Sequence, residues 1–270
     1  MPDDTDDRAA GDEFDPTAAF DLSGRVAVVT GGTRGIGRAV ALGLANAGAD
    51  VVPTSRTPDD VADAVSAVED RGVDSLACPT DVTDTADVTE LFAAVETELG
   101  GVDVVVNNAG VNPESALGPP EATTEDAEAF LLDVNLRGAL RCARAAAECL
   151  RASDGGSLIN VASVGGLVGL PRQHPYVASK HGLVGVTKSM ALDWAPDVRV
   201  NAVAPGYVLT DLTADIEGND RLMESIRDRT PLARFAEPAE IAGPVVFLAS
   251  DAASYVTGAC LAVDGGWTAR

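Results

Sequence analysis

The chain has 270 residues, 46% of them hydrophobic, and a formal net charge of −23 at pH 7. Such an acidic surface repels phosphate backbones and anionic lipids, which argues against nucleic acid or a membrane surface as a partner. The sequence has no run of about 18 apolar residues that could span a membrane and no N-terminal secretory signal, so we expect a cytoplasmic protein.

The kind of charged residue points to a particular environment. Asp outnumbers Glu by 28 to 14, and Lys180 and Lys188 are the only lysines. In about 1 M salt the Debye length is roughly 3 Å, so charges on such a surface would be screened from one another. We therefore expect a protein from a salt-loving organism, with an ordinary acidic cytoplasmic protein as the alternative. The four cysteines have neither C-x-x-C spacing nor a histidine cluster, so no metal site is expected.

Along the chain, an Asp-rich tail precedes a regular alternation of elements. Residues 1–20 lack a hydrophobic period and are predicted to form a disordered tail. Short apolar runs predict strands at 26–30, 50–54, 76–79, 102–107, 157–163, 199–204 and 260–263. Amphipathic stretches predict helices at 36–47, 58–71, 86–99, 124–151, 175–194 and 237–250. Pro53 has no N–H to donate, so the second strand is expected to stop pairing there.

The alternation of strand and helix predicts the fold class. Strands joined by helices form right-handed βαβ units and hence a parallel sheet. We expect one α/β domain over residues 21–270, a Rossmann-type doubly wound sheet of seven parallel strands with helices on both faces. Residues 207–234 break the alternation and are predicted to form a lid over the substrate.

A glycine-rich turn lies between the first predicted strand and the first predicted helix. It reads Thr30-Gly31-Gly32-Thr33-Arg34-Gly35-Ile36-Gly37. Glycine can adopt positive φ and lets the backbone approach a pyrophosphate at a helix N-terminus. A turn of this kind between a strand and a helix predicts a dinucleotide site.

The spacing T-G-x-x-x-G-x-G of this turn resembles that of the short-chain dehydrogenase/reductase family. Four further motifs of that family follow in order: Asp81-Val82, Asn107-Asn108-Ala109-Gly110, Tyr176-x-x-x-Lys180 with Ser163 thirteen residues earlier, and Pro205-Gly206 with Thr210 shortly after. The resemblance covers residues 23 to about 267. It implies an NAD(P)-dependent oxidoreductase that acts on CH–OH groups.

The resemblance also implies a set of cofactor-binding residues. The glycine turn would hold the pyrophosphate, Asp81 and Val82 would contact the adenine, and Val208 and Thr210 would receive the nicotinamide carboxamide. Ordinary packing is the alternative for Val82. The full predicted set is Gly31, Thr33, Arg34, Gly35, Ile36, Gly37, Ser55, Arg56, Asp81, Val82, Asn108, Ala109, Gly110, Tyr176, Lys180, Pro205, Gly206, Val208 and Thr210.

The end of the second strand bears on the choice of cofactor. Dehydrogenases that prefer NAD usually place an acidic residue there to bind the ribose 2′-hydroxyl. Here the segment reads Thr54-Ser55-Arg56, so no carboxylate would repel a 2′-phosphate. The guanidinium groups of Arg34 and Arg56 could bind that phosphate, because such pairs are bidentate. NADP is therefore the expected cofactor, with NAD as the alternative.

The predicted catalytic residues are Asn135, Ser163, Tyr176 and Lys180. Tyr176 and Lys180 are four residues apart, so they share one helix face. Across about 5 Å at an effective dielectric of about 20, the ammonium would favour a tyrosinate by roughly 3 kcal/mol and lower its pKa by about two units. Ser163 would hold the substrate oxygen against Tyr176. By resemblance, Asn135 would hold a water beside Lys180.

The substrate is less well defined by the sequence than the chemistry. The first expectation is a ketone or secondary alcohol of the 3-oxoacyl thioester type, and the alternative is a sugar or sugar acid. A regulatory protein that binds nicotinamide without catalysis is a third possibility, which the intact Ser163, Tyr176 and Lys180 disfavour. The resemblance further implies a homotetramer, built from the helices predicted at 124–151 and 175–194.

Overall fold

The computed structural model describes residues 17–210 and 218–269, and a six-stranded parallel sheet lies at its centre. The strands are β1 (Val26–Thr30), β2 (Asp50–Thr54), β3 (Val104–Asn107), β4 (Gly156–Val161), β5 (Val198–Pro205) and β6 (Cys260–Val263). Their spatial order is β2-β1-β3-β4-β5-β6. The chain places β2 on one side of β1 and the later strands on the other side, as in a doubly wound sheet.

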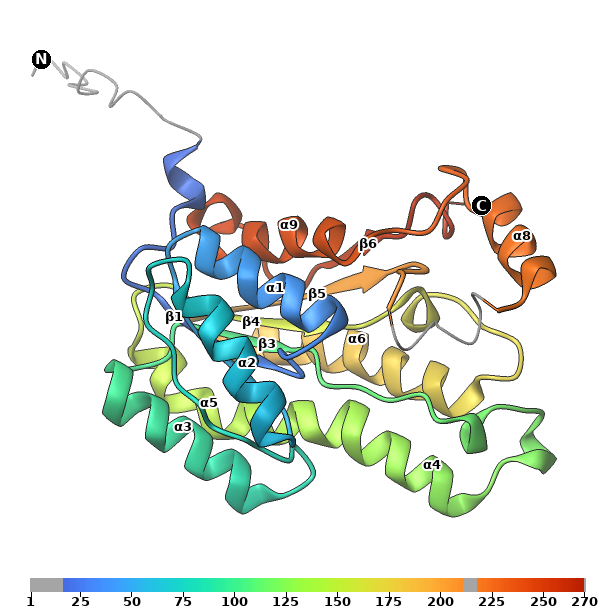
Figure 1. Cartoon of the computed structure of the whole chain (residues 1–270), viewed down its shortest axis with the longest axis horizontal. Helices are drawn as coiled ribbons and strands as arrows, with labels where there is room; N and C mark the ends of the chain where they lie inside the picture. Colours follow the sequence, from blue (N-terminus) through green and yellow to red (C-terminus); the bar gives the residue numbers. More distant parts are fainter. Residues whose placement is uncertain (1–16, 211–217, 270) are drawn as a thin grey trace, which may run out of the picture.

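Helices cover both faces of this sheet (Figure 1). The longer ones are α1 (Gly35–Asn46), α2 (Pro58–Glu69), α3 (Thr85–Leu99), α4 (Glu125–Leu132), α5 (Ala139–Ala152), α6 (His174–Trp194), α8 (Asp220–Arg229) and α9 (Pro238–Ala249). Ala27 and Val29 of β1 face α1 and α9, whereas Val26 and Val28 face the side covered by α3 and α5. Both faces of the inner strands β1 and β3 are buried, which explains their runs of Val.

The prediction of seven strands is wrong for the residues described, because 76–79 form no strand. This segment still runs beside β2. The N–H of Val51 donates to the carbonyl of Asp74 (3.1 Å), and the N–H of Thr80 donates to the carbonyl of Ser55 (2.8 Å). Between these two bonds stands Pro53, which has no N–H for the next rung of a ladder. The prediction that the second strand stops pairing at Pro53 is wrong, because β2 pairs with β1 through Pro53 as far as Thr54. The missing N–H of Pro53 bears only on the outer edge of β2, where residues 76–79 run.

The long helical stretch predicted at 124–151 is present, and it contains a π segment that the sequence did not predict. It consists of α4, a π-helical segment (Asp133–Gly138) and α5. A π segment inserts an extra residue per turn into a helix, and such segments are frequent at functional sites. Asn135 lies within it.

The ends of the domain and the predicted lid are described only in part. Of the predicted tail, residues 17–20 are described, and Ala18–Phe20 form a 3-10 turn whose Phe20 ring lies 6.3 Å from the Phe247 ring. Within the predicted lid, residues 211–217 lie outside the described residues, while 218–234 include α8. Ile226 of α8 packs with Val164, Phe235 and Trp267. None of the described helices is both long and apolar enough to span a membrane.

Candidate active site

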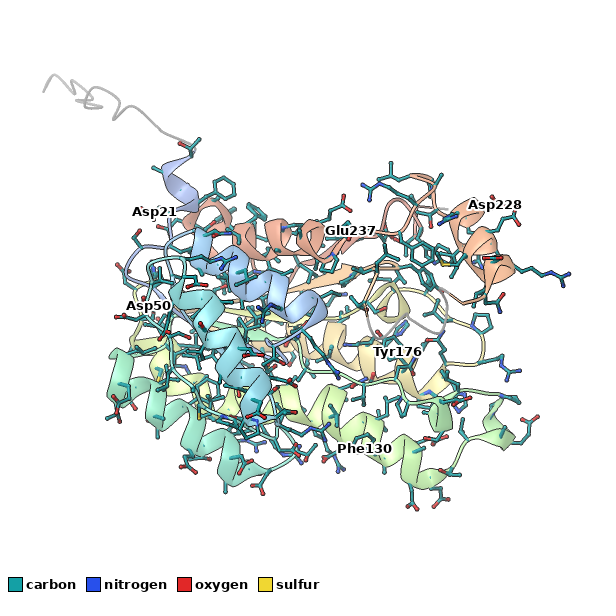
Figure 2. The ribbon with its side chains drawn as sticks, in the orientation of Figure 1. Asp21, Asp50, Phe130, Tyr176, Asp228 and Glu237 are labelled. Atoms are coloured by element: carbon teal, nitrogen blue, oxygen red, sulfur yellow. The ribbon has the colours of Figure 1, made fainter. Side chains whose placement is uncertain are left out.

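A cavity of about 750 Å³ opens at the carboxyl ends of the strands, the edge where open α/β sheets bind ligands. Tyr176 lies on the side of the molecule opposite Asp50, the first residue of β2 (Figure 2). Every predicted cofactor-binding residue lines this cavity, and so do the predicted catalytic residues Ser163, Tyr176 and Lys180. Of the predicted site residues, only Asn135 lies behind the cavity wall. No group of three metal-ligating side chains occurs within residues 17–210 and 218–269.

The glycine turn is shaped for a close approach of backbone and ligand. Gly31 and Gly35 have positive φ values of 62° and 52°. A Cβ on Gly37 would overlap the carbonyl oxygen of Gly31 and the side-chain amide of Asn108. That amide donates to the carbonyls of Thr30 (2.9 Å) and Gly31 (3.0 Å), which fixes the turn. The turn leads into α1, whose first N–H groups have no acceptor within the helix and so suit a pyrophosphate.

The end of β2 lines one side of the cavity. Ser55 Oγ is buried and has no hydrogen-bond partner among the described residues, and Arg56 beside it is exposed. Burial opposes ionisation of Asp81, yet hydrogen bonds from Thr83 and the positive charge of Arg56 together hold the pKa of Asp81 below its ordinary value. An unpartnered hydroxyl beside a guanidinium fits a phosphate, which accepts hydrogen bonds from both. The residues present therefore fit a dinucleotide that carries an additional phosphate on its ribose.

Ser163, Tyr176 and Lys180 meet at the wall of the cavity. Ser163 follows β4, and its Oγ accepts the Gly165 N–H (3.1 Å) and is hydrogen-bonded to the Tyr176 hydroxyl. Lys180 is only 4% exposed, and its Nζ lies 5.7 Å from the centre of the Tyr176 ring. The Lys180 ammonium donates to the carbonyl of Val161 (2.8 Å). The predicted helical juxtaposition of Tyr176 and Lys180 is thus present.

The electrostatics of this group differ from the prediction. Burial raises the pKa of Tyr176 above its ordinary value, against the opposing effect of the Ser163 hydrogen bond. The net shift is upward, opposite to the prediction. Lys180 is itself buried, which lowers the pKa of Lys180 to about 8, and its ammonium donates to the Val161 carbonyl. In the protein without a ligand the phenol is therefore protonated at neutral pH.

Burial of Lys180 predicts a dependence of stability on pH. The folded state holds this proton with a pKa of about 8 and the unfolded state with one near 10.5. Between these values the unfolded chain binds more protons, so the free energy of unfolding should rise with pH, by up to about 3 kcal/mol. We expect urea titrations from pH 7.5 to 10 to show this rise in wild type relative to Lys180→Met. A difference that is flat or falls with pH would refute the buried ammonium.

Asn135 lies behind the cavity wall and is hydrogen-bonded to it. It is 1% exposed, its Oδ1 accepts the N–H of Val111 (2.8 Å), and its Nδ2 donates to the carbonyl of Val111 (2.9 Å) and to Ser179 Oγ (3.3 Å). A Cβ on Gly110 would lie 3.5 Å from Asn135 Oδ1 and 3.7 Å from Lys180 Nζ. Asn135 thus lies close to Lys180, but its amide is engaged in fixing the segment that follows Gly110.

Several residues that line the cavity lie outside the predicted set. Asn112, Leu170, Gln173 and Tyr207 are among them. Each stands within a few residues of a recognised motif: Asn112 two after Gly110, Gln173 three before Tyr176, and Tyr207 directly after Gly206. Their positions next to the motifs were the available signal.

Comparison with known proteins agrees with this geometry. The family model described as Enoyl-(Acyl carrier protein) reductase matches residues 31–268. The chain is 39% identical to 2-dehydro-3-deoxy-D-gluconate 5-dehydrogenase of Escherichia coli K12 over 257 residues, which cover 94% of this chain and 99% of that protein. It is 40% identical to the 3-oxoacyl-[acyl-carrier-protein] reductase FabG of Staphylococcus aureus over 242 residues, covering 89% of this chain and 96% of the reductase.

A solved structure extends the comparison to the fold. The gluconate 5-dehydrogenase of Burkholderia cenocepacia J2315, in complex with NADP and tartrate, superimposes with a TM-score of 0.90 at 35% identity. The match covers 95% of this chain and all of that one. With the glycine turn, the Tyr176 and Lys180 pair and Ser163 arranged around one cavity, the chain belongs to the short-chain dehydrogenase/reductase family.

Proposed function

We propose that this protein transfers a hydride between NADP and a ketone or secondary alcohol, with Tyr176 as the group that moves the proton. The observation that carries the proposal is the meeting of Ser163, Tyr176 and Lys180 in the cavity that also contains the glycine turn. The family relationship supports the same reaction class. A protein that binds nicotinamide without catalysis would have no need of this arrangement.

The bound cofactor supplies or accepts the hydride, and the protein donates or accepts the proton. In reduction, Ser163 Oγ and the Tyr176 hydroxyl both donate to the carbonyl oxygen, and Tyr176 transfers its proton to the developing alkoxide. The raised pKa of Tyr176 keeps the phenol protonated and ready for this step. In oxidation, Tyr176 must first lose its own proton to solvent, and its phenolate then takes the proton of the alcohol. The buried Lys180 ammonium then stabilises the phenolate across the cavity, where the low dielectric strengthens their attraction.

We assign the cofactor-binding residues by their places around the cavity. The turn from Gly31 to Gly37 holds the pyrophosphate, and Asp81 and Val82 lie at the adenine. Asn108, Ala109 and Gly110, together with Tyr176 and Lys180, line the ribose. The segment after β5 receives the carboxamide, through Pro205, Gly206, Val208 and Thr210. Asn135 is a positioning residue, since it fixes the backbone of Val111 and does not line the cavity.

NADP is the proposed cofactor because of Ser55, Arg34 and Arg56. Ser55 Oγ is buried without a partner among the described residues, and Arg34 and Arg56 line the same part of the cavity. We predict that Arg56→Ala raises Kd for NADPH about tenfold, since a charge-assisted contact contributes about 1.5–3 kcal/mol, and leaves Kd for NADH nearly unchanged. Arg71→Ala, a change at an exposed arginine just after α2, serves as the control. Equal weakening of both cofactors would contradict this assignment.

Two substrate classes remain as candidates. One is a 3-oxoacyl thioester or a related 3-oxo compound, which the similarity to a 3-oxoacyl reductase supports. A sugar or sugar acid is supported by the similarity to dehydrogenases of such compounds and by the polar wall that contains Asn112 and Gln173. We further propose that the protein is cytoplasmic, adapted to high salt, and assembled as a homotetramer through the faces of α4, α5 and α6.

The proposed function is tested by two assays in molar KCl. One follows consumption of NADPH with ethyl acetoacetate, and the other follows reduction of NADP with a panel of aldoses and D-gluconate. Turnover in either assay is the expected result. Absence of turnover in both, while NADPH still binds, would favour a regulatory nicotinamide-binding protein instead.

A further inference from the structure

The part of the cavity beyond Tyr176 has a polar wall made by two neutral amides. Asn112 lies in the segment after β3, and Gln173 is the residue before α6. Both line the cavity that contains Ser163 and Tyr176. A substrate whose oxygen rests on Ser163 and Tyr176 would extend toward this wall.

The two side-chain amides are hydrogen-bonded to each other, and one amide oxygen has no partner among the described residues. Asn112 Nδ2 donates to Gln173 Oε1 at 3.2 Å. Asn112 Oδ1 is buried and has no hydrogen-bond partner among the described residues. A buried amide oxygen without a partner is costly, and such groups in native proteins call for an explanation. A bound ligand that brings a hydrogen-bond donor explains this one.

The wall is fixed before any ligand arrives. The N–H of Gly118, in the segment that follows Asn112, donates to the carbonyl of Arg172, which precedes Gln173 (2.9 Å). Arg172 itself has φ of 63°, a conformation that non-glycine residues rarely adopt without surrounding constraint. The segments that carry Asn112 and Gln173 are thus joined by a backbone bond as well as by their side chains.

The chemistry of the wall selects among ligand groups. An amide oxygen accepts a hydrogen bond, so its partner must donate one, as a hydroxyl does and as a carboxylate or thioester carbonyl does not. The described residues that line the cavity include three cations, Arg34, Arg56 and Lys180. The first two lie at the adenosine side, and the third is buried beside Tyr176. This wall therefore offers a substrate hydroxyl an acceptor in Asn112 Oδ1, and it brings no cation to pair with a carboxylate.

We propose that the Asn112–Gln173 pair determines specificity by accepting a hydrogen bond from a substrate hydroxyl near the reacting carbonyl. The substrate is then a polyhydroxylated ketone or alcohol and not an unsubstituted acyl chain. This inference rests on the proposed hydride transfer at Ser163 and Tyr176. It goes beyond that proposal by naming the side chains that recognise the substrate.

The test uses two ketones with the same four-carbon skeleton. L-Erythrulose carries three hydroxyls and 2-butanone carries none, and each is reduced with NADPH by wild type, Asn112→Leu and Gln173→Leu. We expect wild type to prefer erythrulose in kcat/KM and Asn112→Leu to lower that preference about tenfold, mainly through KM for erythrulose. Gln173→Leu should lower it less, because Asn112 keeps its oxygen but loses its anchor. Asn46→Leu, the same change at an exposed residue of α1, should leave the preference as in wild type.

The outcomes separate this inference from the proposed function. A merely structural role for Asn112 would lower kcat/KM for both ketones in parallel and leave the preference intact, which would overturn the inference. Reduction of 2-butanone or ethyl acetoacetate by wild type without a preference for erythrulose would also overturn it, while hydride transfer would stand. Reduction of none of the three ketones would overturn both.

Discussion

Tyr176→Phe should lower kcat by about a thousandfold while leaving Kd for NADPH within about twofold of wild type, because a positioned general acid contributes about 10²–10⁴ to a rate. The phenol is the group that donates to the carbonyl oxygen, and Phe keeps the ring that packs against Ala116, Ala127 and Leu131. The loss should therefore appear in turnover and not in folding. Steady-state kinetics and fluorescence titration with NADPH measure the two quantities.

A matched control for this substitution is available on the surface. Tyr255 is fully exposed, at 102% relative accessibility, so Tyr255→Phe removes a hydroxyl far from any described contact of the site. It should behave as wild type in both measurements. If Tyr176→Phe kept a kcat near that of Tyr255→Phe, proton transfer by the phenol would be ruled out.

The second large effect should come from Gly37→Val. A side chain at this position overlaps the Gly31 carbonyl and the Asn108 amide, so the turn must move. A displacement of about 1 Å in a positioning segment can cost about 100-fold in kcat/KM, and we expect NADPH binding to weaken by a comparable factor. Isothermal titration with NADPH measures this loss, and thermal unfolding should show a lower Tm because the turn is overpacked.

Gly243→Ala provides the contrast to Gly37→Val. Gly243 lies in α9, and a Cβ there would meet no described atom within 4 Å. Alanine in a helix interior is favoured over glycine by about 0.5–1 kcal/mol, so this variant should bind NADPH normally and be slightly more stable. Normal NADPH binding by Gly37→Val would show that the cofactor does not rest on this turn.

Much of the fold could be predicted because local patterns determine it. The runs 26–30 and 50–54 form strands at the predicted positions, since Val-rich runs that are buried on both faces suit a parallel sheet. The glycine turn and the pair Tyr176 and Lys180 could be predicted to share one site, because strand ends in such sheets meet at one edge. They line one cavity in the structure.

Other features depend on tertiary contacts that no local pattern encodes. The π segment around Asn135 accompanies hydrogen bonds to Val111, 24 residues earlier in the chain. The sign of the Tyr176 pKa shift depends on the burial of the phenol, which raises the pKa more than the Ser163 hydrogen bond lowers it. The pairing of Asn112 with Gln173 joins residues 61 positions apart. Pro53 is another such case, since β2 pairs with β1 through Pro53 to Thr54, and the residue's missing N–H bears only on the outer edge of the strand.

The most direct test is a crystal structure of the wild-type protein with NADP and a secondary alcohol that it oxidises. The account predicts the alcohol oxygen within about 3 Å of both Tyr176 Oη and Ser163 Oγ, with the nicotinamide ring on its other side and the pyrophosphate on the turn from Gly31 to Gly37. An alcohol oxygen beyond hydrogen-bond reach of Tyr176, in a complex that turns over in the crystal, would contradict it.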